Sequence, residues 1–171
     1  MPTTRWEPLE EADLDRVDAI QHVIHAGLPE KLDFLGEKRR LFPEGCRRLV
    51  RDGTMLGYAM AHPWILGSVP ALNAPLGALP DRPDCLHMHD VAILPEGRGA
   101  EAAGTYVAHL LRLAGAMGIE ALACVSVYGT GPLWGRHGFT PATARPPVAS
   151  YGPDAVYMVR QVADAGMLNG S

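Results

Sequence analysis

The chain has 171 residues, 47% hydrophobic and 20% charged, which is enough for one domain with a substantial core. Its net charge of −4 argues against a nucleic-acid-binding protein, which usually carries a basic face. No apolar run reaches the roughly 20 residues that cross a membrane, and the N-terminus shows no hydrophobic signal region. The three cysteines (Cys46, Cys85 and Cys124) are not spaced like metal ligands. We therefore expect one cytoplasmic domain over residues 1–171, with no metal, nucleic-acid or membrane partner.

The first half of the chain predicts a strand, two helices and a β-hairpin. Apolar residues recur at helical spacing from Leu14 to Ile24, and Gly27 and Pro29 end this helix. The Asp52-Gly53 step between two apolar runs is typical of a hairpin turn. The expected elements are strands at Arg5–Pro8, Arg47–Val50 and Met55–Ala61 and helices at Leu14–Ile24 and Glu30–Leu41.

The segment from Pro63 to Asp84 contains five prolines and shows little periodicity. A structureless stretch of this length is uncommon inside a domain and is usually functional or mobile. Because it also carries apolar residues, we expect it to pack onto the domain, either as a substrate lid or wall or as an inert insertion.

The second half alternates strands and helices. A strand at Leu86–Leu94 precedes a helix that has a continuous apolar face and ends at Gly118. The remaining expected elements are a buried strand at Ala121–Val127, a short helix at Thr130–Arg136 and a last strand at Ala155–Val162. This order predicts an α/β fold, with a ligand at the carboxyl ends of the central strands.

The junction between the central strand and its helix is the most informative stretch. The strand runs through Pro95 into a Gly/Arg turn that opens directly into the helix. The first turn of a helix has unpaired N–H groups and the positive end of the helix dipole, so this junction predicts an anion site.

Two histidines, His87 and His89, precede this junction on the strand. Residues two apart on a strand point to the same face, so both imidazoles could line one cleft and accept a proton near neutral pH. The alternatives are hydrogen-bonded strand residues without a catalytic role, or a metal site, for which further ligands are not apparent. Asp90 points to the opposite face in a regular strand, unless a bulge redirects it.

Two motifs in this half resemble the GNAT superfamily of acetyl-CoA-dependent N-acetyltransferases. The first is Val91-Ala92-Ile93-Leu94-Pro95-Glu96-Gly97-Arg98-Gly99-Ala100-Glu101-Ala102-Ala103, and the second is Leu133-Trp134-Gly135-Arg136-His137-Gly138-Phe139. The resemblance implies a single-domain fold with a mixed sheet of about six to seven strands and about four helices. The histidine pair is similar to that of the arylalkylamine (serotonin) N-acetyltransferases, in which two histidines help to remove the proton of the amine.

The resemblance also implies which residues bind acetyl-CoA. The backbone of Val91, Ala92 and Ile93 would pair with the pantetheine arm. The backbone amides of the turn would hold the diphosphate, and Trp134 would border the cofactor. The turn residues are Arg98, Gly99, Ala100, Glu101, Ala102 and Ala103.

Two positions depart from the family pattern. Glu101 stands where the signature has glycine, so its carboxylate would repel the diphosphate. Trp134 stands where many relatives have the tyrosine that protonates the leaving thiolate, and Tyr128 is the nearest other phenol.

The expected function is acetyl transfer from acetyl-CoA to a primary amine of a small molecule, by direct attack in a ternary complex. His87 and His89 would act as the base or proton relay, and Tyr128 as the acid. The alternatives are an inactive acyl-CoA-binding module and an N-acetyltransferase of proteins or peptides. Edge strands of such sheets often pair between subunits, so a homodimer is expected.

Overall fold

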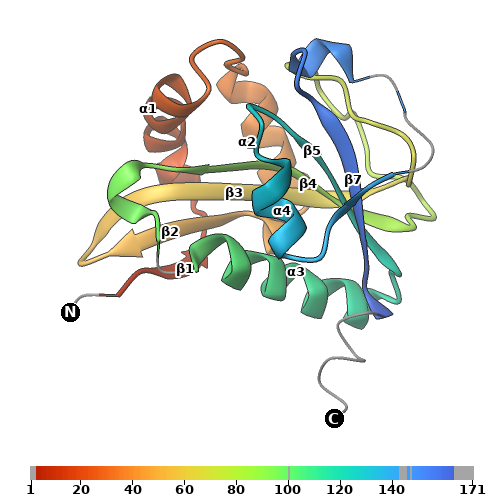
Figure 1. Cartoon of the computed structure of the whole chain (residues 1–171). Coiled ribbons are helices and arrows are strands. Elements are labelled where there is room, and N and C mark those ends of the chain that lie inside the picture. Colours follow the sequence, from red (N-terminus) through yellow and green to blue (C-terminus); the bar gives the residue numbers. More distant parts are fainter. Residues whose placement is uncertain (1–2, 100, 143–145, 147, 164–171) are drawn as a thin grey trace.

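A computed structural model describes residues 3–99, 101–142, 146 and 148–163. The strands of these residues form one sheet in the order β1-β2-β3-β4-β5-β7-β6 (Figure 1). Only β4 and β5 are parallel neighbours, and the other neighbours are antiparallel. The strands are β1 (Arg5–Pro8), β2 (Arg47–Arg51), β3 (Thr54–Trp64), β4 (Cys85–Ile93), β5 (Ala121–Ser126), β6 (Thr140–Pro141) and β7 (Val156–Gln161). The predicted α/β fold with a mixed sheet is confirmed.

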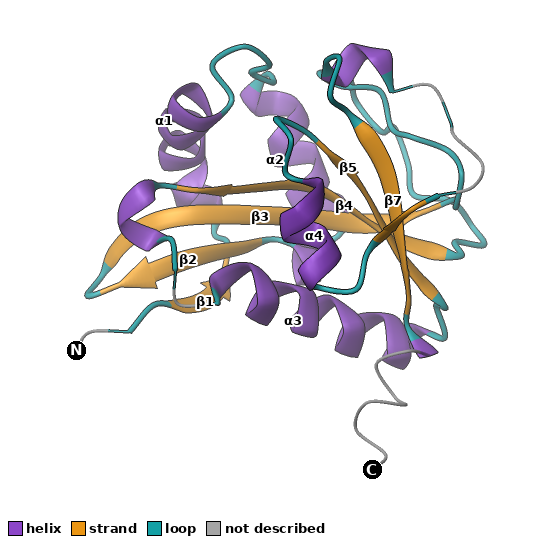
Figure 2. Ribbon diagram, viewed as in Figure 1, coloured by secondary structure: helices purple, strands orange, loops and turns teal. Residues whose placement is uncertain are grey.

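Helices cover both faces of the sheet (Figure 2). They are α1 (Leu14–Ile24), α2 (Leu32–Leu41), α3 (Ala102–Met117) and α4 (Gly131–Arg136). Helices α1 and α2 pack through Val17, Ile20 and Leu35 onto one face. On the other face, α3 packs through residues at helical spacing, including Tyr106 and Leu110, and α4 adds Trp134 to the same cluster.

The predicted and observed elements differ mainly at their ends. Helix α2 begins at Leu32 and not at Glu30, because Lys31 is extended (φ −62°, ψ 137°). Glu30 is therefore free of the helix and turns into the protein, where it is buried. Strand β3 continues to Trp64, since that residue pairs with Cys85 of β4. The two-residue strand β6, which pairs with β7, has no signal in the sequence.

Strands β4 and β5 separate after four pairs of residues. Their parallel pairing runs from Cys85 opposite Ala121 to Met88 opposite Cys124 and stops there (Figure 1). On its other side β4 stays paired with β3 as far as Ile93. The second half of β4 therefore has an edge without a strand partner among the described residues, and this edge faces β5 across a wedge.

A β-bulge interrupts β4 at His89. Met88 and Asp90 oppose consecutive residues of β3, Ala61 and Met60, so His89 is the extra residue. The bulge places Asp90 on the face covered by α1, where it contacts His25, just after α1, and Tyr58 of β3. The expectation that Asp90 points away from the histidines holds only for a regular strand, and this strand is bulged.

The segment between β3 and β4 is fixed to the domain by hydrogen bonds at several points. The Tyr151 hydroxyl donates to the carbonyl oxygen of Pro70, and the Tyr157 hydroxyl accepts from the N–H of Gly67. The backbone N–H of Asn73 donates to Glu30 Oε1 at 2.8 Å. The segment thus packs on the domain as expected, and its contact at Glu30 brings it to the edge of the wedge.

Candidate active site

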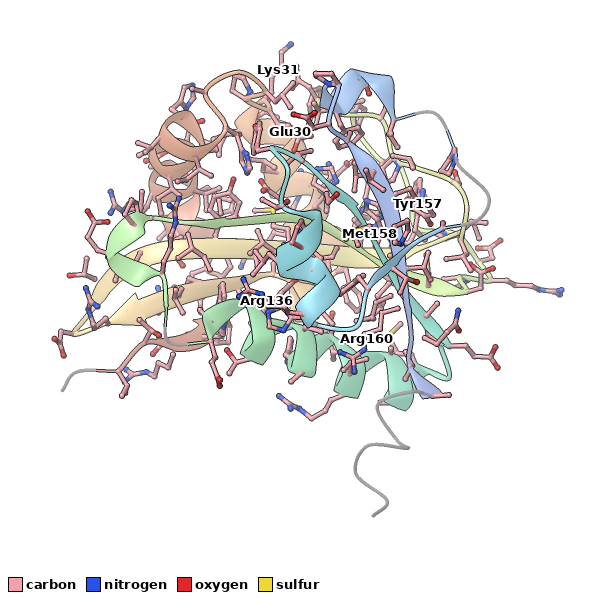
Figure 3. All side chains as sticks on the ribbon, in the orientation of Figure 1. Glu30, Lys31, Arg136, Tyr157, Met158 and Arg160 are labelled. Carbon is pink, nitrogen blue, oxygen red and sulfur yellow. The ribbon has the colours of Figure 1, made fainter. Side chains whose placement is uncertain are left out.

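A cavity of about 910 Å³ lies in the wedge between β4 and β5. Its walls come from both faces of the sheet. At one end are Arg98, Glu101, Ala102, Ala103, Arg136 and His137; at the other end are Ile24, His25, Leu28, Glu30, Leu72, Asp90 and Tyr128. Figure 3 shows Glu30 beside the α1–α2 end of the wedge and Arg136 at the opposite end, near α3. The first end combines basic side chains with one carboxylate, whereas the second combines acidic, aromatic and apolar side chains.

The basic end contains the strand-to-helix junction. The N–H of Leu94 donates to the carbonyl oxygen of Leu56 on β3. Peptide groups point alternately to the two edges of a strand, so those of Val91 and Ile93 point to the open edge of β4. Arg98 Nε already donates to the carbonyl oxygen of Ile93 at 3.0 Å. The side chain of Ala92 is buried on the face of the sheet that α1 covers. An extended group laid along β4 would thus meet the backbone of Val91 and Ile93.

The N-terminus of α3 opens into the same end of the cavity. Gly99 has a φ of +100°, and a Cβ atom built there would meet nothing within 4 Å. No side-chain hydrogen bond caps the helix at Glu101. Ala102 and Ala103 border the cavity, while Ala100 lies outside the described residues. The geometry therefore fits a phosphate held by main-chain amides.

Glu101 occupies the N-cap position of α3 in a left-handed conformation, with φ +57°. Glycine adopts this conformation readily, whereas a residue with a side chain is strained there. The exposed Glu101 side chain borders the cavity and does not bond the helix amides. The carboxylate thus leaves the cradle open but adds a negative charge beside it.

The two histidines of β4 lie deeper than the sequence suggests. His87 is 1% exposed and does not border the cavity, and the side chain of His89 is 0% exposed. His62 of β3 completes a cluster with ring centroids 5.7–6.2 Å apart. Burial and the other imidazoles lower the pKa of His62 to about 3 and that of His87 well below its ordinary value. His89 does border the cavity as a residue, although its imidazole has no exposed surface, so neither predicted imidazole is exposed.

Glu30 connects His89 to the cavity wall. Its Oε2 lies 2.8 Å from His89 Nε2, and the side chain is 4% exposed. Burial alone would raise the pKa of Glu30, but the partners His89 and Asn73 outweigh it and lower the pKa to about 2. Lys38 is also fully buried, and burial lowers its pKa. The carboxylate of Glu30, at the acidic end, therefore stays ionised at neutral pH.

Asp90, His25 and Tyr128 form a second hydrogen-bonded chain at this end. His25 Nε2 lies 2.7 Å from Asp90 Oδ1, and His25 Nδ1 lies 3.2 Å from the Tyr128 hydroxyl. The Tyr58 hydroxyl donates to the other Asp90 oxygen at 2.6 Å. Burial alone would lower the pKa of His25, but Asp90 reverses this and raises it. Burial and Asp90 raise the pKa of Tyr128, so its phenol stays protonated.

Of the polar side chains at the acidic end, sequence reasoning singled out Tyr128 and considered Asp90, but it missed His25 and Glu30. Both residues lie where α1 ends and α2 has not begun, a position at which polar residues are usually solvent-exposed. The one usable signal was their place between two helices, next to Gly27 and Pro29. Trp134 borders the cavity from α4, with its ring edge-on to Phe139.

No described group of three or more His, Cys, Asp or Glu side chains is arranged to hold a metal ion. The cluster of His62, His87 and His89 is therefore not arranged as a metal site either. Within the described residues, no helix has the length and apolar character needed to cross a membrane.

The fold, but not the sequence, matches known proteins. No protein-family model and no curated protein matches the chain. The loading GNATL domain of CurA from Lyngbya majuscula has a TM-score of 0.77 and 12% identity, covering 94% of this chain and 98% of that one. The ribosomal-protein-S18-alanine N-acetyltransferase from Escherichia coli has a TM-score of 0.66 and 18% identity, with 94% of each chain covered.

A larger protein shows the same likeness over part of its length. N-acetylglutamate synthase from Neisseria gonorrhoeae, complexed with coenzyme A and N-acetyl-glutamate, has a TM-score of 0.69 and 18% identity. The match covers 93% of this chain, which spans 35% of the synthase. These likenesses confirm the predicted GNAT-like fold.

Proposed function

We propose that the protein transfers an acetyl group from acetyl-CoA to a primary amine. The observation that carries this proposal is the open edge of β4, which leads from the cradle at α3 to an acidic end with titratable side chains. The thioester would lie between these ends, where the backbone N–H groups of β4 could polarise its carbonyl oxygen. Val91, Ile93 and the Arg98–Ala103 turn would hold the cofactor, and Trp134 would border it.

The difference in charge between the two ends supports an anionic donor and a cationic acceptor. Arg98, Arg136 and His137 surround the end that would receive the phosphates. Glu30 and Asp90 lie at the other end, where they would attract an ammonium group. Ile24, Leu28 and Leu72 border this end, which favours an amine with an apolar body. On this view the segment 65–84 supplies a substrate wall through Leu72.

The amine must lose a proton before it can attack, and the leaving thiolate must gain one. Tyr128 would act as the acid; its position at the border of the cavity and its raised pKa, which keeps the phenol protonated, support this role. His89 would act indirectly, through its hydrogen bond to Glu30. His87 is a buried neighbour of His89 in the three-histidine cluster. A carboxylate held ionised at Glu30 suits the binding of an ammonium group.

Calorimetry with coenzyme A and an assay of thiol release together test the proposal. The expected result is binding of coenzyme A, and thiol release from acetyl-CoA that depends on an added amine. Absence of binding at millimolar coenzyme A would refute the proposal. Binding without turnover of any amine or peptide would instead indicate an acyl-CoA-binding module.

Comparing small amines with peptides decides the acceptor class. The fold occurs both in the E. coli enzyme named for a ribosomal protein and in N-acetylglutamate synthase. Faster turnover of apolar primary amines than of peptides with a free N-terminus would support a small-molecule acceptor. The reverse order would assign the protein to the peptide-modifying class.

A further inference from the structure

We propose that His25, held by Asp90, and Tyr128 form a two-way proton shuttle that carries a proton from the acceptor amine to the leaving thiolate. This inference rests on the proposed acetyl transfer and assigns a positioning role to His25, which acts through Tyr128. The observation behind it is the unbroken series of hydrogen bonds from Asp90 through both nitrogens of one imidazole to a phenol at the cavity.

The two contacts of His25 determine its tautomer. Asp90 accepts from Nε2–H, so Nδ1 of the neutral ring is left to accept the phenolic proton of Tyr128. Tyr58 donates to the second oxygen of Asp90, which fixes the carboxylate. The side chains of His25 and Asp90 are 14% and 9% exposed, so the imidazolium that forms is shielded from water and paired with a carboxylate.

Tyr128 is held in an unusual conformation that keeps it beside His25. Its φ is +55° and that of Gly129 is +72°, and the N–H of Thr130 donates to the carbonyl oxygen of Val127 at 3.0 Å. These features describe a tight turn with two left-handed residues, which strains a tyrosine. The turn places the phenol ring against His25, with centroids 5.7 Å apart, and 52% of the residue remains exposed.

The proposed transfer is balanced in protons and charge. The bound ammonium group first loses one proton to solvent water, which leaves a neutral amine. As the amine nitrogen bonds to the thioester carbon, a second proton passes from it to the Tyr128 oxygen, and the phenolic proton passes to His25 Nδ1. When the carbon–sulfur bond breaks, the thiolate takes the proton of Tyr128, which regains one from His25. The products are the amide and the free thiol, and His25 ends neutral, as it began.

The pH dependence follows from the groups around His25. Asp90 of β4, Glu30 and Tyr128 lie closest, while Tyr58 of β3 and Lys38 of α2 act through Asp90. The shuttle starts from neutral His25, whose pKa Asp90 raises despite burial. The turnover rate should therefore rise as the pH rises through this pKa. Asp90→Asn should move the rise to lower pH, and His25→Gln should remove it.

The decisive experiment is a double-mutant cycle of turnover with acetyl-CoA and the best acceptor amine. His25→Gln and Tyr128→Phe should each lower kcat about 100-fold or more. The double variant should be no slower than the slower single variant, because both residues serve one step. His22→Gln is the matched control on α1, since His22 is exposed and hydrogen-bonds Asp18 outside the cavity.

Several outcomes would overturn the shuttle. These are unchanged turnover in His25→Gln, multiplicative losses in the double variant, or a pH profile that Asp90→Asn leaves in place. Tyr128→Phe changes an exposed side chain, so an unchanged kcat in that variant decides the matter even if His25→Gln does not fold. A wild-type protein without amine-dependent thiol release would instead refute the proposed function itself.

Discussion

The two ends of the cavity are built in different ways. The basic end comes from one continuous stretch, Ile93 to Ala103, with Arg136 added from α4. The acidic end is assembled from His25 and Glu30 after α1, Asp90 on β4 and Tyr128 after β5. Main-chain groups therefore dominate one end and buried side-chain hydrogen bonds the other. The difference predicts that substitutions at the acidic end will affect stability, while those at the basic end will affect mainly ligand affinity.

The largest effect is expected from Glu30→Gln. The pKa of Glu30 is lowered from 4.5 to about 2, so the ionised carboxylate stabilises the folded state. This stabilisation, about 3 kcal/mol, is fully present above pH 4.5 and is lost as the pH falls through about 2. Denaturant unfolding of wild type and variant between pH 7 and pH 2 measures it.

The matched control for this measurement is Glu11→Gln, a change at a largely exposed glutamate of the surface. The control should change the free energy of unfolding by less than about 0.5 kcal/mol at every pH. A difference between wild type and Glu30→Gln that stays constant from pH 7 to pH 2 would contradict the assignment.

An intermediate effect is expected from Glu101→Gly. Removing the carboxylate should tighten the binding of coenzyme A about 5-fold, because repulsion of the diphosphate is worth about 1 kcal/mol in water. Relief of the left-handed strain should also raise the free energy of unfolding by about 1 kcal/mol. Calorimetry and denaturant unfolding measure the two effects separately.

Glu101→Gln separates charge from strain at this position. The glutamine variant should gain the affinity but not the stability, since it loses the charge and keeps a side chain at φ +57°. Equal affinity of wild type and both variants would show that Glu101 lies away from the diphosphate.

The smallest effect is expected from Arg136→Gln at the exposed border of the basic end. Loss of this charge should weaken the binding of coenzyme A about 3-fold at low salt, and the loss should vanish near 1 M salt because exposed charges are screened. Arg112→Gln, an exposed arginine on α3, is the control. A loss of affinity that persists at high salt would indicate a buried, direct contact.

The contrast between the two ends also explains what could be predicted from the sequence. The junction at Pro95–Ala103 is local, so the strand, turn and helix that form it carry their signals in consecutive residues. The same is true of the hairpin at Asp52-Gly53, whose two residues have positive φ values of 51° and 76°. Sequence periodicity thus sufficed for the α/β fold and for the position of the cradle.

The acidic end depends on contacts between distant residues. Helix α2 begins two residues later than its pattern suggests, and this places Glu30 against His89, 59 residues away. The bulge at His89 results from the register of β3 with β4, which no residue of β4 reveals alone. Regular alternation correctly placed His87 and His89 on one face, but it could not show how deeply they are buried or that the bulge brings Asp90 to the same face.

Because His89 is the extra residue of the bulge in β4, its contact with Glu30 can be removed separately from the contact between Asp90 and His25. Shortening the strand by removing His89 would leave Met60 opposite Asp90 and restore an even ladder, so Asp90 would still face α1. The carboxylate–imidazole contact with His25 could then survive in a chain one residue shorter, while Glu30 would lose its partner. A change of length at this position would therefore dissect the two acidic pairs more cleanly than an exchange of side chains.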